Sequence, residues 1–365
     1  INLNNGNNLI GNNLTAKNNF VRGTGDDGLA IFSNNPGSGT NMDTVTLDHN
    51  TSIAPWWADG IRVAGGQNIT VTNNYSADAV TNTGLVVGIF GAQGFPLVSA
   101  TITDNVIERG GGGTYPYAVF FSGGGTSQTA TATFARNNIV DALYYGFSAG
   151  NYGSATFGPG NVINAPGLNA IFVRSNTVSA SGTYQNNAAI NLPSGQTAFN
   201  NQAGANYAAT LSGNSWQYSP PIADGTYVAL ARHSGLALDI THGWTANGSL
   251  LEQWGKNGGS NQSWTLNSLG GNVYRIIGLG SGRALEAPNA SLTAGTVLDI
   301  YDWNEDGNQL WSIVQTDPGY YTVTNVNSGL VMEVSGGVGA VSPGAAVDQW
   351  NYGLQYNKQW SFVSP

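Results

Sequence analysis

Short apolar segments recur along the first 215 residues of the chain at intervals of 24 to 34 residues. Each segment follows a small residue and carries branched or aromatic side chains in a similar order. The segments begin at Gly28, Gly60, Gly84, Ala118, Gly146 and Ala170. One coil of this size cannot bury its apolar side alone, so neighbouring coils must stack at the strand spacing of ~4.8 Å to create a core. The pattern predicts an all-β fold, with a right-handed parallel β-helix over residues 1–217.

Asparagines repeat in step with these segments, and each precedes another strand-like stretch. They are Asn19, Asn50, Asn74, Asn105, Asn138 and Asn161. A side-chain amide both donates and accepts hydrogen bonds, so we expect these residues to bond from coil to coil. The alternative fold is a Gly-rich β-sandwich, which needs hairpin turn signals every ~8 to 12 residues. Those signals are missing here.

The start of the chain aligns with the inside of a coil, because residues 1–6 match residues 61–66. Residue 1 is therefore expected to lie within a strand. An uncapped end strand exposes unpaired backbone groups, which natural solenoids avoid. We expect that upstream coils belong to the same precursor, that residues 1–217 are the C-terminal part of a catalytic solenoid, and that an upstream fragment is a partner of this chain.

A different repeat begins after a stiff linker at residues 218–222, where tandem prolines can join neither a strand ladder nor a helix. Past the linker, an Asn followed by a Gln-x-Trp-like triplet occurs three times, at separations of 47 and 49 residues. The triplets begin at Gln262, Gln309 and Lys358. Three strand-rich units of this length predict a threefold barrel with the triplet tryptophans in its centre. These are Trp264, Trp311 and Trp360.

Residues 223–365 resemble the ricin-type β-trefoil of family 13 carbohydrate-binding modules. The resemblance implies one shallow sugar pocket per repeat, in which carboxylates accept sugar hydroxyls, an aromatic ring stacks on the sugar face and an Asn completes the hydrogen bonds. The residues implied are Asp239, Glu252, Trp254 and Asn261 in the first repeat, Glu286, Asp299, Tyr301 and Asn308 in the second, and Glu333, Asp348, Trp350 and Asn357 in the third. The third repeat departs from the pattern at Lys358, where the others carry Gln.

Composition and net charge limit the classes of molecule that this chain is expected to bind. Only 8% of the 365 residues are charged and the net charge is −9, which makes nucleic acid and anionic lipid poor partners. No apolar run reaches the ~18 residues of a membrane span, so no membrane partner is expected. The chain contains no Cys, which removes disulfide, zinc-thiolate and Cys-nucleophile chemistry. No cofactor or catalytic metal is expected, and the sequence does not determine whether a structural Ca²⁺ ion is bound. A polysaccharide is the expected partner, and the sugar-binding module alone leads us to expect a secreted, extracellular protein.

Carboxylates are scarce in the first two thirds of the chain, so their placement matters. Aligning Gly28 with Gly60 puts Asp27 and Asp59 on neighbouring coils, about one strand spacing apart. Such coupling separates the two pKa values and lets one carboxyl act as an acid while another acts as a base, as glycoside hydrolysis requires. Asp26 is a third catalytic candidate. The alternative is that these Asp-Gly pairs only form turns.

Two tryptophans and an arginine lie close to these acids in the sequence. Trp56 and Trp57 precede Asp59 by three and two residues, and Arg62 follows it. Indole rings of this kind stack on sugar faces or cover an apolar patch. We therefore include all three residues as candidate substrate contacts of the β-helix.

Residues 20–31, together with residues 58–61, resemble the family 87 glycoside hydrolases, the α-1,3-glucanases and mycodextranases. The resemblance is strongest over residues 1–75. It implies an inverting hydrolase built on a parallel β-helix, in which an Asp pair works with an Asp from the preceding coil. Asp26 and Asp27 match the pair, and the third Asp would lie before Ile1. Asp59 then has a weaker role in substrate contact or pKa tuning.

The expected function is that of a secreted, inverting α-glucanase acting on α-1,3-glucan or nigeran, with the trefoil as its anchor on a neutral α-glucan. Three alternatives stay open. A polygalacturonase would need a His-Gly and an Arg-x-Lys set, but the solenoid histidine, His49, lies in an Asp-His-Asn turn. A pectate-lyase-like enzyme would need Ca²⁺-binding carboxylates and a basic proton acceptor. The third is a non-catalytic glycan-binding adhesin or lectin.

Overall fold

The computed structural model describes residues 1–5, 11–33, 40–88, 94–122, 130–150, 154–175, 180–217 and 221–365. Its regular structure consists of strands and short 3-10 turns, which confirms the predicted all-β class. The chain divides into two compact units, Ile1–Asn214 and Ser215–Pro365. Within these ranges, no helix is both long and apolar enough to cross a membrane.

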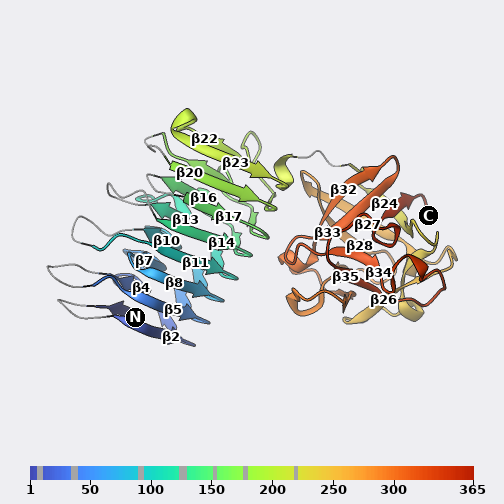
Figure 1. Cartoon of the computed structure of the whole chain (residues 1–365), viewed down its shortest axis with the longest axis horizontal. Coiled ribbons are helices and arrows are strands. Elements are labelled where there is room, and N and C mark those ends of the chain that lie inside the picture. The colour runs from blue at the N-terminus through green and yellow to red at the C-terminus, as the bar shows by residue number, and fades with distance from the viewer. Residues whose placement is uncertain are drawn as a thin grey trace. The chain divides into compact units, whose positions relative to one another are not determined.

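Three parallel sheets build the first unit, and Figure 1 shows their strands stacked coil upon coil. The first sheet contains β1 (Asn2–Asn4), β4 (Leu29–Phe32), β7 (Ile61–Ala64), β10 (Leu85–Gly88), β13 (Tyr117–Ser122), β16 (Tyr145–Gly150), β19 (Ile171–Val173) and β22 (Phe199–Asn201). The second contains β2 (Asn12–Lys17), β5 (Asp43–Asp48), β8 (Gln67–Thr72), β11 (Ser99–Thr103), β14 (Thr131–Ala135), β17 (Ser154–Phe157), β20 (Ala180–Gln185) and β23 (Tyr207–Ser212). The third contains β3 (Phe20–Arg22), β6 (Thr51–Ile53), β9 (Tyr75–Ala77), β12 (Val106–Glu108), β15 (Asn138–Val140), β18 (Val162–Asn164) and β21 (Ala188–Ile190). The unit is therefore a parallel β-solenoid.

The strand register matches the alignment expected from the repeats. Leu29 pairs with Ile61, and Ile61 pairs with Leu85. Asn2 pairs with Ala30, so the first residues of the chain do align with the inside of a coil. One inward-facing position of the first sheet forms a buried apolar column through the unit, made of Leu29, Ile61, Leu85, Val119, Phe147 and Ile171.

Asparagine side chains bond from coil to coil, as the sequence predicted, and the ladder is longer than expected. It runs through Asn19, Asn50, Asn74, Asn105, Asn137, Asn161, Asn187 and Asn214. The predicted member Asn138 is wrong by one residue, because Asn137 takes the ladder position and Asn138 opens β15. Two adjacent asparagines cannot be told apart by type, and only the register selects the first.

Asn105 illustrates how one rung is satisfied. Its side-chain amide donates to Oδ1 of Asn137 at 3.0 Å and to the backbone oxygen of Val71 at 2.9 Å. Its own Oδ1 accepts from the backbone and side-chain nitrogens of Asn74 at 2.9 and 3.0 Å. Because Asn105 is fully buried, these bonds replace the water that the amide and its neighbours would otherwise need.

The second unit is a ricin-type β-trefoil, whose strands join in one antiparallel network. Its strands are β24 (Gly225–Ala231), β25 (Ala237–Ile240), β26 (Ser249–Trp254), β27 (Trp264–Gly270), β28 (Val273–Gly278), β29 (Ala284–Glu286), β30 (Thr296–Val297), β31 (Asp299–Tyr301), β32 (Leu310–Asp317), β33 (Tyr320–Asn325), β34 (Val331–Val334), β35 (Val347–Trp350) and β36 (Trp360–Val363). Its 3-10 turns are η2 (Ser215–Gln217), η3 (Thr241–Gly243), η4 (Ser260–Gln262), η5 (Pro288–Ala290), η6 (Gly307–Gln309), η7 (Gly337–Gly339) and η8 (Tyr356–Lys358), and η1 (Gly204–Asn206) belongs to the β-helix.

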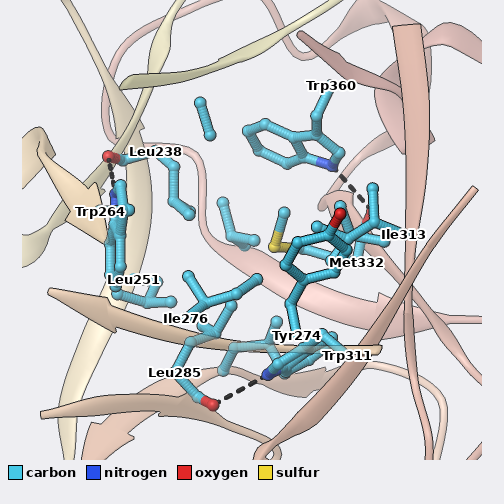
Figure 2. Packing of buried hydrophobic residues seen from close by; sticks show 14 of the residues in the cluster. Leu238, Leu251, Trp264, Tyr274, Ile276, Leu285, Trp311, Ile313, Met332 and Trp360 are labelled. Carbon is cyan, nitrogen blue, oxygen red and sulfur yellow. Dashed lines mark hydrogen bonds between the residues drawn. The ribbon is translucent and has the colours of Figure 1, made fainter. Parts of the chain in front are cut away.

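The three triplet tryptophans meet in the core of the trefoil, as expected (Figure 2). Trp264, Trp311 and Trp360 are each 0% exposed. A buried indole N–H needs an acceptor, and each finds the backbone oxygen of a strand residue in its own repeat. The acceptors are Leu238, Leu285 and Met332, at 3.1, 2.9 and 3.1 Å.

The linker predicted at residues 218–222 lies largely among residues 218–220, which fall outside the described ranges. The boundary between the two compact units lies at Asn214 and Ser215. The stiff-linker interpretation of the tandem prolines stays a prediction.

The asparagine ladder yields a stability prediction. Replacing Asn105 with Ala leaves the buried backbone nitrogen of Asn74 without its acceptor and removes one donor from the oxygens of Val71 and Asn137, and an orphaned buried group costs about 1 to 3 kcal/mol. We expect the free energy of unfolding of the β-helix to fall by at least about 2 kcal/mol. Denaturant unfolding followed by circular dichroism measures this, with the trefoil transition as an internal reference.

The matched control is Asn12→Ala, which removes an exposed asparagine from strand β2. Its unfolding curve should overlay that of the unsubstituted chain. Equal curves for Asn105→Ala and Asn12→Ala would show that the ladder does not hold the coils together.

Candidate functional site

Three carboxylates occupy equivalent places in the trefoil. Asp239 lies in β25, Glu286 in β29 and Glu333 in β34, and they are only 3%, 5% and 6% exposed. Each directly follows the residue whose backbone oxygen accepts the core tryptophan bond. Successive side chains of a strand point to opposite faces. Because the residue before each carboxylate lies against the core, the carboxylate points away from the core.

Side-chain amides hold the first two carboxylates. Oδ2 of Asp239 accepts from Asn261 at 2.8 Å and from Gln262 at 2.6 Å. Oε2 of Glu286 accepts from Gln309 at 2.8 Å and from Asn308 at 3.3 Å. Both donors reach the same oxygen in each case. Burial raises the pKa of Asp239 and of Glu286, and these amide donors counteract the rise.

Lys358 replaces the glutamine of the other repeats and makes equivalent bonds. Its Nζ lies 3.3 Å from Oε2 of Glu333 and donates to the backbone oxygen of Asn351 at 2.9 Å. Gln262 and Gln309 likewise donate to the backbone oxygen of the residue after the pocket aromatic. Asn357 also reaches Oε2 of Glu333, at 3.2 Å. The departure at Lys358 therefore changes the charge of the third pocket and preserves its hydrogen-bond pattern.

A second carboxyl group faces each of these three across the neighbouring strand. Asp239 pairs with Glu252, Glu286 with Asp299 and Glu333 with Asp348. These second carboxyls are Glu252, half-buried, and Asp299 and Asp348, both buried. In Asp299 and Asp348 the buried Oδ1 has no hydrogen-bond partner.

Burial and the neighbouring carboxylate raise the pKa of the second group. The pKa of Asp299 rises to about 7, first because of burial and then because of the negative charge of Glu286. The pKa of Asp348 rises to about 6 for the same two reasons, and the charge of Lys358 counteracts the rise. Burial also raises the pKa of Glu252. Each site thus holds one carboxyl that keeps its proton more readily than a free side chain does.

An exposed aromatic ring ends the strand beside each carboxyl pair. The rings belong to Trp254, Tyr301 and Trp350, which are 46%, 44% and 41% exposed. An aromatic side chain left in water this far is available to pack on an apolar face of a ligand.

Glycines of one repeat lie against the site of the next. A side chain on Gly295 would meet the Trp350 ring at 3.1 Å, and one on Gly344 would meet the Trp254 ring at 3.6 Å. Gly295 and Gly344 both have left-handed φ angles, 86° and 88°. Their backbone nitrogens donate to the oxygens of Gln349 and Gln253, which fixes the loops against the neighbouring strands. The rings of Trp254 and Trp350 are therefore each backed by the chain of another repeat.

In the β-helix, Asp26 and Asp27 lie together in the loop between β3 and β4. Asp26 is exposed, and its Oδ1 accepts the backbone N–H of Asp27 at 2.9 Å. The side chain of Asp27 is 8% exposed and lies 3.1 Å from Nε of Arg62. Burial raises the pKa of Asp27, and the positive charge of Arg62 partly offsets this.

Asp59 stacks next to Asp27, as the coil alignment predicted, but its side chain is bonded to groups of the neighbouring coils. Its backbone nitrogen donates to Oδ1 of Asp27 at 2.9 Å, and its own Oδ1 accepts from the backbone and hydroxyl of Thr83 at 2.9 and 2.5 Å. The guanidinium of Arg62 binds the other oxygen. With 1% exposure and these partners, Asp59 joins coils and has no exposed oxygen for a substrate, so the expected substrate contact is corrected to a structural one. After burial, the negative charge of Asp59 also contributes to the raised pKa of Asp27, which is the other role expected of it. Arg62 bridges the two acids and is mostly buried.

Trp56 and Trp57 are 67% and 61% exposed, in the loop between β6 and β7. The ring of Trp56 lies over the backbone of Gly25, where an added side chain would meet Nε1 at 3.1 Å. The structure thus brings Trp56 beside the loop that carries Asp26 and Asp27.

Sequence reasoning missed the residues that orient the trefoil carboxylates. Gln262, Gln309 and Lys358 were treated only as markers of the repeat, although each holds a carboxylate. The signal was present, because a polar side chain that recurs before a core Trp in every repeat needs a buried partner. The glycines at 295 and 344 carried no signal of their own, since their role depends on contacts between repeats.

Within the described ranges of the chain, no cluster of three or more His, Cys, Asp or Glu side chains could hold a metal ion.

A family model described as a ricin-type beta-trefoil lectin domain-like family matches the chain in three overlapping stretches, residues 212–301, 260–350 and 307–364. The spacing of these stretches follows the three repeats. Among curated proteins, none matches the chain.

Several solved structures are similar to part of the chain. A designed threefold symmetric protein, ThreeFoil, is 37% identical, with coverage of 39% of this chain and 100% of that chain and a TM-score of 0.38. An exo-beta-1,3-galactanase from Clostridium thermocellum is 29% identical over 40% of this chain and 31% of that chain, with a TM-score of 0.37. The ricin B-like lectin of Macrolepiota procera, solved with lactose, is 19% identical over 40% of this chain and 100% of that chain, with a TM-score of 0.33.

The family match agrees with the three core tryptophans and the three equivalent carboxylates. Residues 212–364 of this chain form a ricin-type β-trefoil lectin-like domain.

Proposed function

We propose that the trefoil binds glycans through three surface pockets, one in each repeat. The observation that carries the proposal is how its carboxylates are held. In each repeat, donors from neighbouring side chains converge on a single oxygen, Oδ2 of Asp239 or Oε2 of Glu286 and Glu333. The other oxygen receives none of these donors and is left to accept from a ligand.

A sugar ring fits such a pocket because it has both hydroxyl donors and an apolar C–H face. The carboxylate accepts hydroxyl hydrogen bonds, and the exposed ring of Trp254, Tyr301 or Trp350 packs on the apolar face. The second carboxyl of the pair, Asp299 or Asp348, donates to a sugar oxygen while it keeps its proton. The protonated carboxyl, the carboxylate and the aromatic ring then all contact the same sugar ring.

Three weak pockets on one domain gain strength on a polymer, because the second and third contacts become intramolecular. We therefore infer that a neutral polysaccharide is the ligand, since the trefoil carries more acidic than basic groups. The resemblance of residues 20–31 to the family 87 glycoside hydrolases supports an α-glucan as the polymer. The sugar-binding module supports an extracellular place of action.

The three exposed aromatic rings of the pockets lead to a prediction about the affinity for a polysaccharide. Trp254→Ala, Tyr301→Ala and Trp350→Ala should each weaken binding to insoluble α-1,3-glucan several-fold, because each removes one stacking face. Combining all three should weaken binding by at least about 100-fold, since the avidity is lost as well. Depletion of the full-length chain from solution by the polysaccharide measures the affinity.

Leu269→Ala is the control, because it truncates an apolar side chain near the end of β27 that lies farthest along the strand from Asn261 and Gln262. Its affinity should equal that of the unsubstituted chain. If the triple variant binds as tightly as Leu269→Ala, the three pockets are not the binding sites.

The carboxyl pairs predict how stability depends on pH. A carboxyl whose pKa is higher in the folded than in the unfolded chain stabilises the fold below the unfolded value, and this contribution is lost as the pH rises through the folded value. For Asp299 the window runs from 3.8 to about 7. The trefoil should therefore melt at a lower temperature at pH 8 than at pH 5.

Asp299→Asn removes this titration and keeps a neutral hydrogen-bonding group of the same shape. Its melting temperature should vary less between pH 5 and pH 8, and at pH 8 it should exceed that of the unsubstituted chain. Differential scanning calorimetry across this range measures both effects. Asp302→Asn, on the exposed loop that follows, should leave the pH profile unchanged. A steeper profile for Asp299→Asn than for the unsubstituted chain would contradict the account.

Hydrolysis of the bound glycan by the β-helix is a second candidate function. It is favoured by the exposed Asp26, the raised pKa of the neighbouring Asp27 and the ring of Trp56 beside them. A carboxyl whose pKa is raised, next to one that is open to water, suits the acid and base of an inverting α-1,3-glucanase. The alternative is a non-catalytic glycan-binding adhesin or lectin.

Release of reducing ends from α-1,3-glucan decides between these two. If the β-helix is catalytic, the full chain releases reducing ends and Asp26→Asn lowers the rate by at least about 100-fold, within the range for loss of a general acid or base. Asp43→Asn, which changes an acid in strand β5 of the second sheet, away from Asp26 and its loop, should leave the rate unchanged. No release by the unsubstituted chain, with binding intact, would leave the non-catalytic function.

A further inference from the structure

The loops that lead from the third sheet to the first form one edge of the β-helix. We call residues 23–28, 54–60, 78–84, 109–116, 141–144 and 165–170 the loop edge. Each of these loops begins at a residue with a left-handed φ angle, at Gly23, Ala54, Asp78, Arg109, Asp141 and Ala165. The backbone nitrogen at each corner donates to the next coil, for example from Ala54 to Ala77 at 2.9 Å. The corners therefore stack in line.

Exposed apolar side chains are concentrated on this edge. Among the described residues of the β-helix, nine large apolar or aromatic side chains are exposed, and six of them lie on the loop edge. The six are Trp56, Trp57, Val80, Tyr115, Leu143 and Tyr144, which are 40–67% exposed. The concentration matters because single exposed apolar residues are ordinary on a protein surface, whereas a row of them indicates a binding surface.

Hydrogen bonds between coils hold the row in order. The backbone nitrogen of Trp56 donates to Thr24 at 3.0 Å, and the hydroxyl of Thr81 donates to the oxygen of Trp56 at 2.9 Å. In later coils, Thr114 donates to Thr81 at 3.2 Å and Leu168 to Tyr144 at 2.7 Å. Trp56 and Tyr144 belong to coils three steps apart, so at ~4.8 Å per step the row is about 15 Å long. Its length suits an extended chain better than a single small molecule.

The charges of the edge exclude anionic partners. Asp26 and Asp141 are exposed on it, whereas the cation Arg109 is held by Asp78 at 2.6 Å and by Glu108. Nucleic acid and anionic lipid need free cations, which the described part of the edge does not offer. Carboxylates and threonine hydroxyls between aromatic rings complement a neutral polyol, which has hydroxyl donors and apolar faces.

We propose that the loop edge is a second glycan-binding surface, which takes an extended neutral polysaccharide chain along the stack of coils. Trp56 and Trp57 form one end of this surface, and Tyr115 and Tyr144 continue it. The proposal is independent of the trefoil pockets, and because Asp26, Asp27 and Trp56 lie on the loop edge it deepens the second candidate function by naming the surface along which a substrate chain would lie. It assigns to the β-helix a role in binding that persists when the trefoil does not bind.

The test uses the full chain with its trefoil pockets disabled by Trp254→Ala, Tyr301→Ala and Trp350→Ala together. This background should still bind at least one of four insoluble neutral polysaccharides, namely α-1,3-glucan, cellulose, xylan and galactan. Adding Tyr115→Ala and Tyr144→Ala should lower that residual affinity by at least about tenfold, since two stacking faces are lost. Adding Phe20→Ala, which truncates an aromatic ring that is 67% exposed on the third sheet, should not change it.

Three results would overturn the proposal. The background variant could bind none of the four polysaccharides, or the tyrosine variant could bind as well as the background. The third such result would come from sedimentation. The unsubstituted chain would self-associate and the variant with Tyr115→Ala and Tyr144→Ala would be monomeric, which would mean that the loop edge joins two copies of the chain. Failure of the trefoil proposal is seen separately, because it would leave binding by the unsubstituted chain unaffected by the three trefoil substitutions.

Discussion

A buried side-chain amide must find partners for its donors and its acceptor, and both units of this chain are organised by that requirement. In the β-helix, Asn105 and its equivalents bond one coil to the next. In the trefoil, Gln262 and Gln309 hold a carboxylate instead of another amide. The first arrangement satisfies every group internally and builds a scaffold. The second directs its donors to one carboxylate oxygen and leaves the other for a ligand.

This difference explains why the trefoil carries the stronger functional argument. Its carboxylates are buried yet incompletely used, and each stands beside an exposed ring. In the β-helix, by contrast, the carboxylate of Asp59 accepts hydrogen bonds from Thr83 and pairs with Arg62, so its charge holds neighbouring coils together. Asp26 and the aromatic loop edge are the parts of that unit that stay open to a partner. Recognition is thus placed on loops and strand ends, while the stacked strands supply rigidity.

Much of this could be predicted from the sequence, because both folds are repeats. The strand register followed from the spacing of Gly28, Gly60 and Gly84, and the trefoil core from its three tryptophans. The individual partners of a side chain in the next coil or repeat were not predictable. The choice of Asn137 over Asn138, the burial of Asp59 and the role of Lys358 all depend on which backbone group lies opposite in the next coil or repeat. A sequence pattern does not give that information.

The three carboxylates held by side-chain amides are the proposed glycan-binding groups of the trefoil. Their involvement can be measured by nuclear magnetic resonance of the side-chain amides while an α-1,3-linked gluco-oligosaccharide is added. The account predicts that the Asn261, Asn308 and Asn357 side-chain signals shift with the ligand, while those of Asn105 and Asn137 stay in place. Saturable binding that leaves all three trefoil signals unmoved would contradict it.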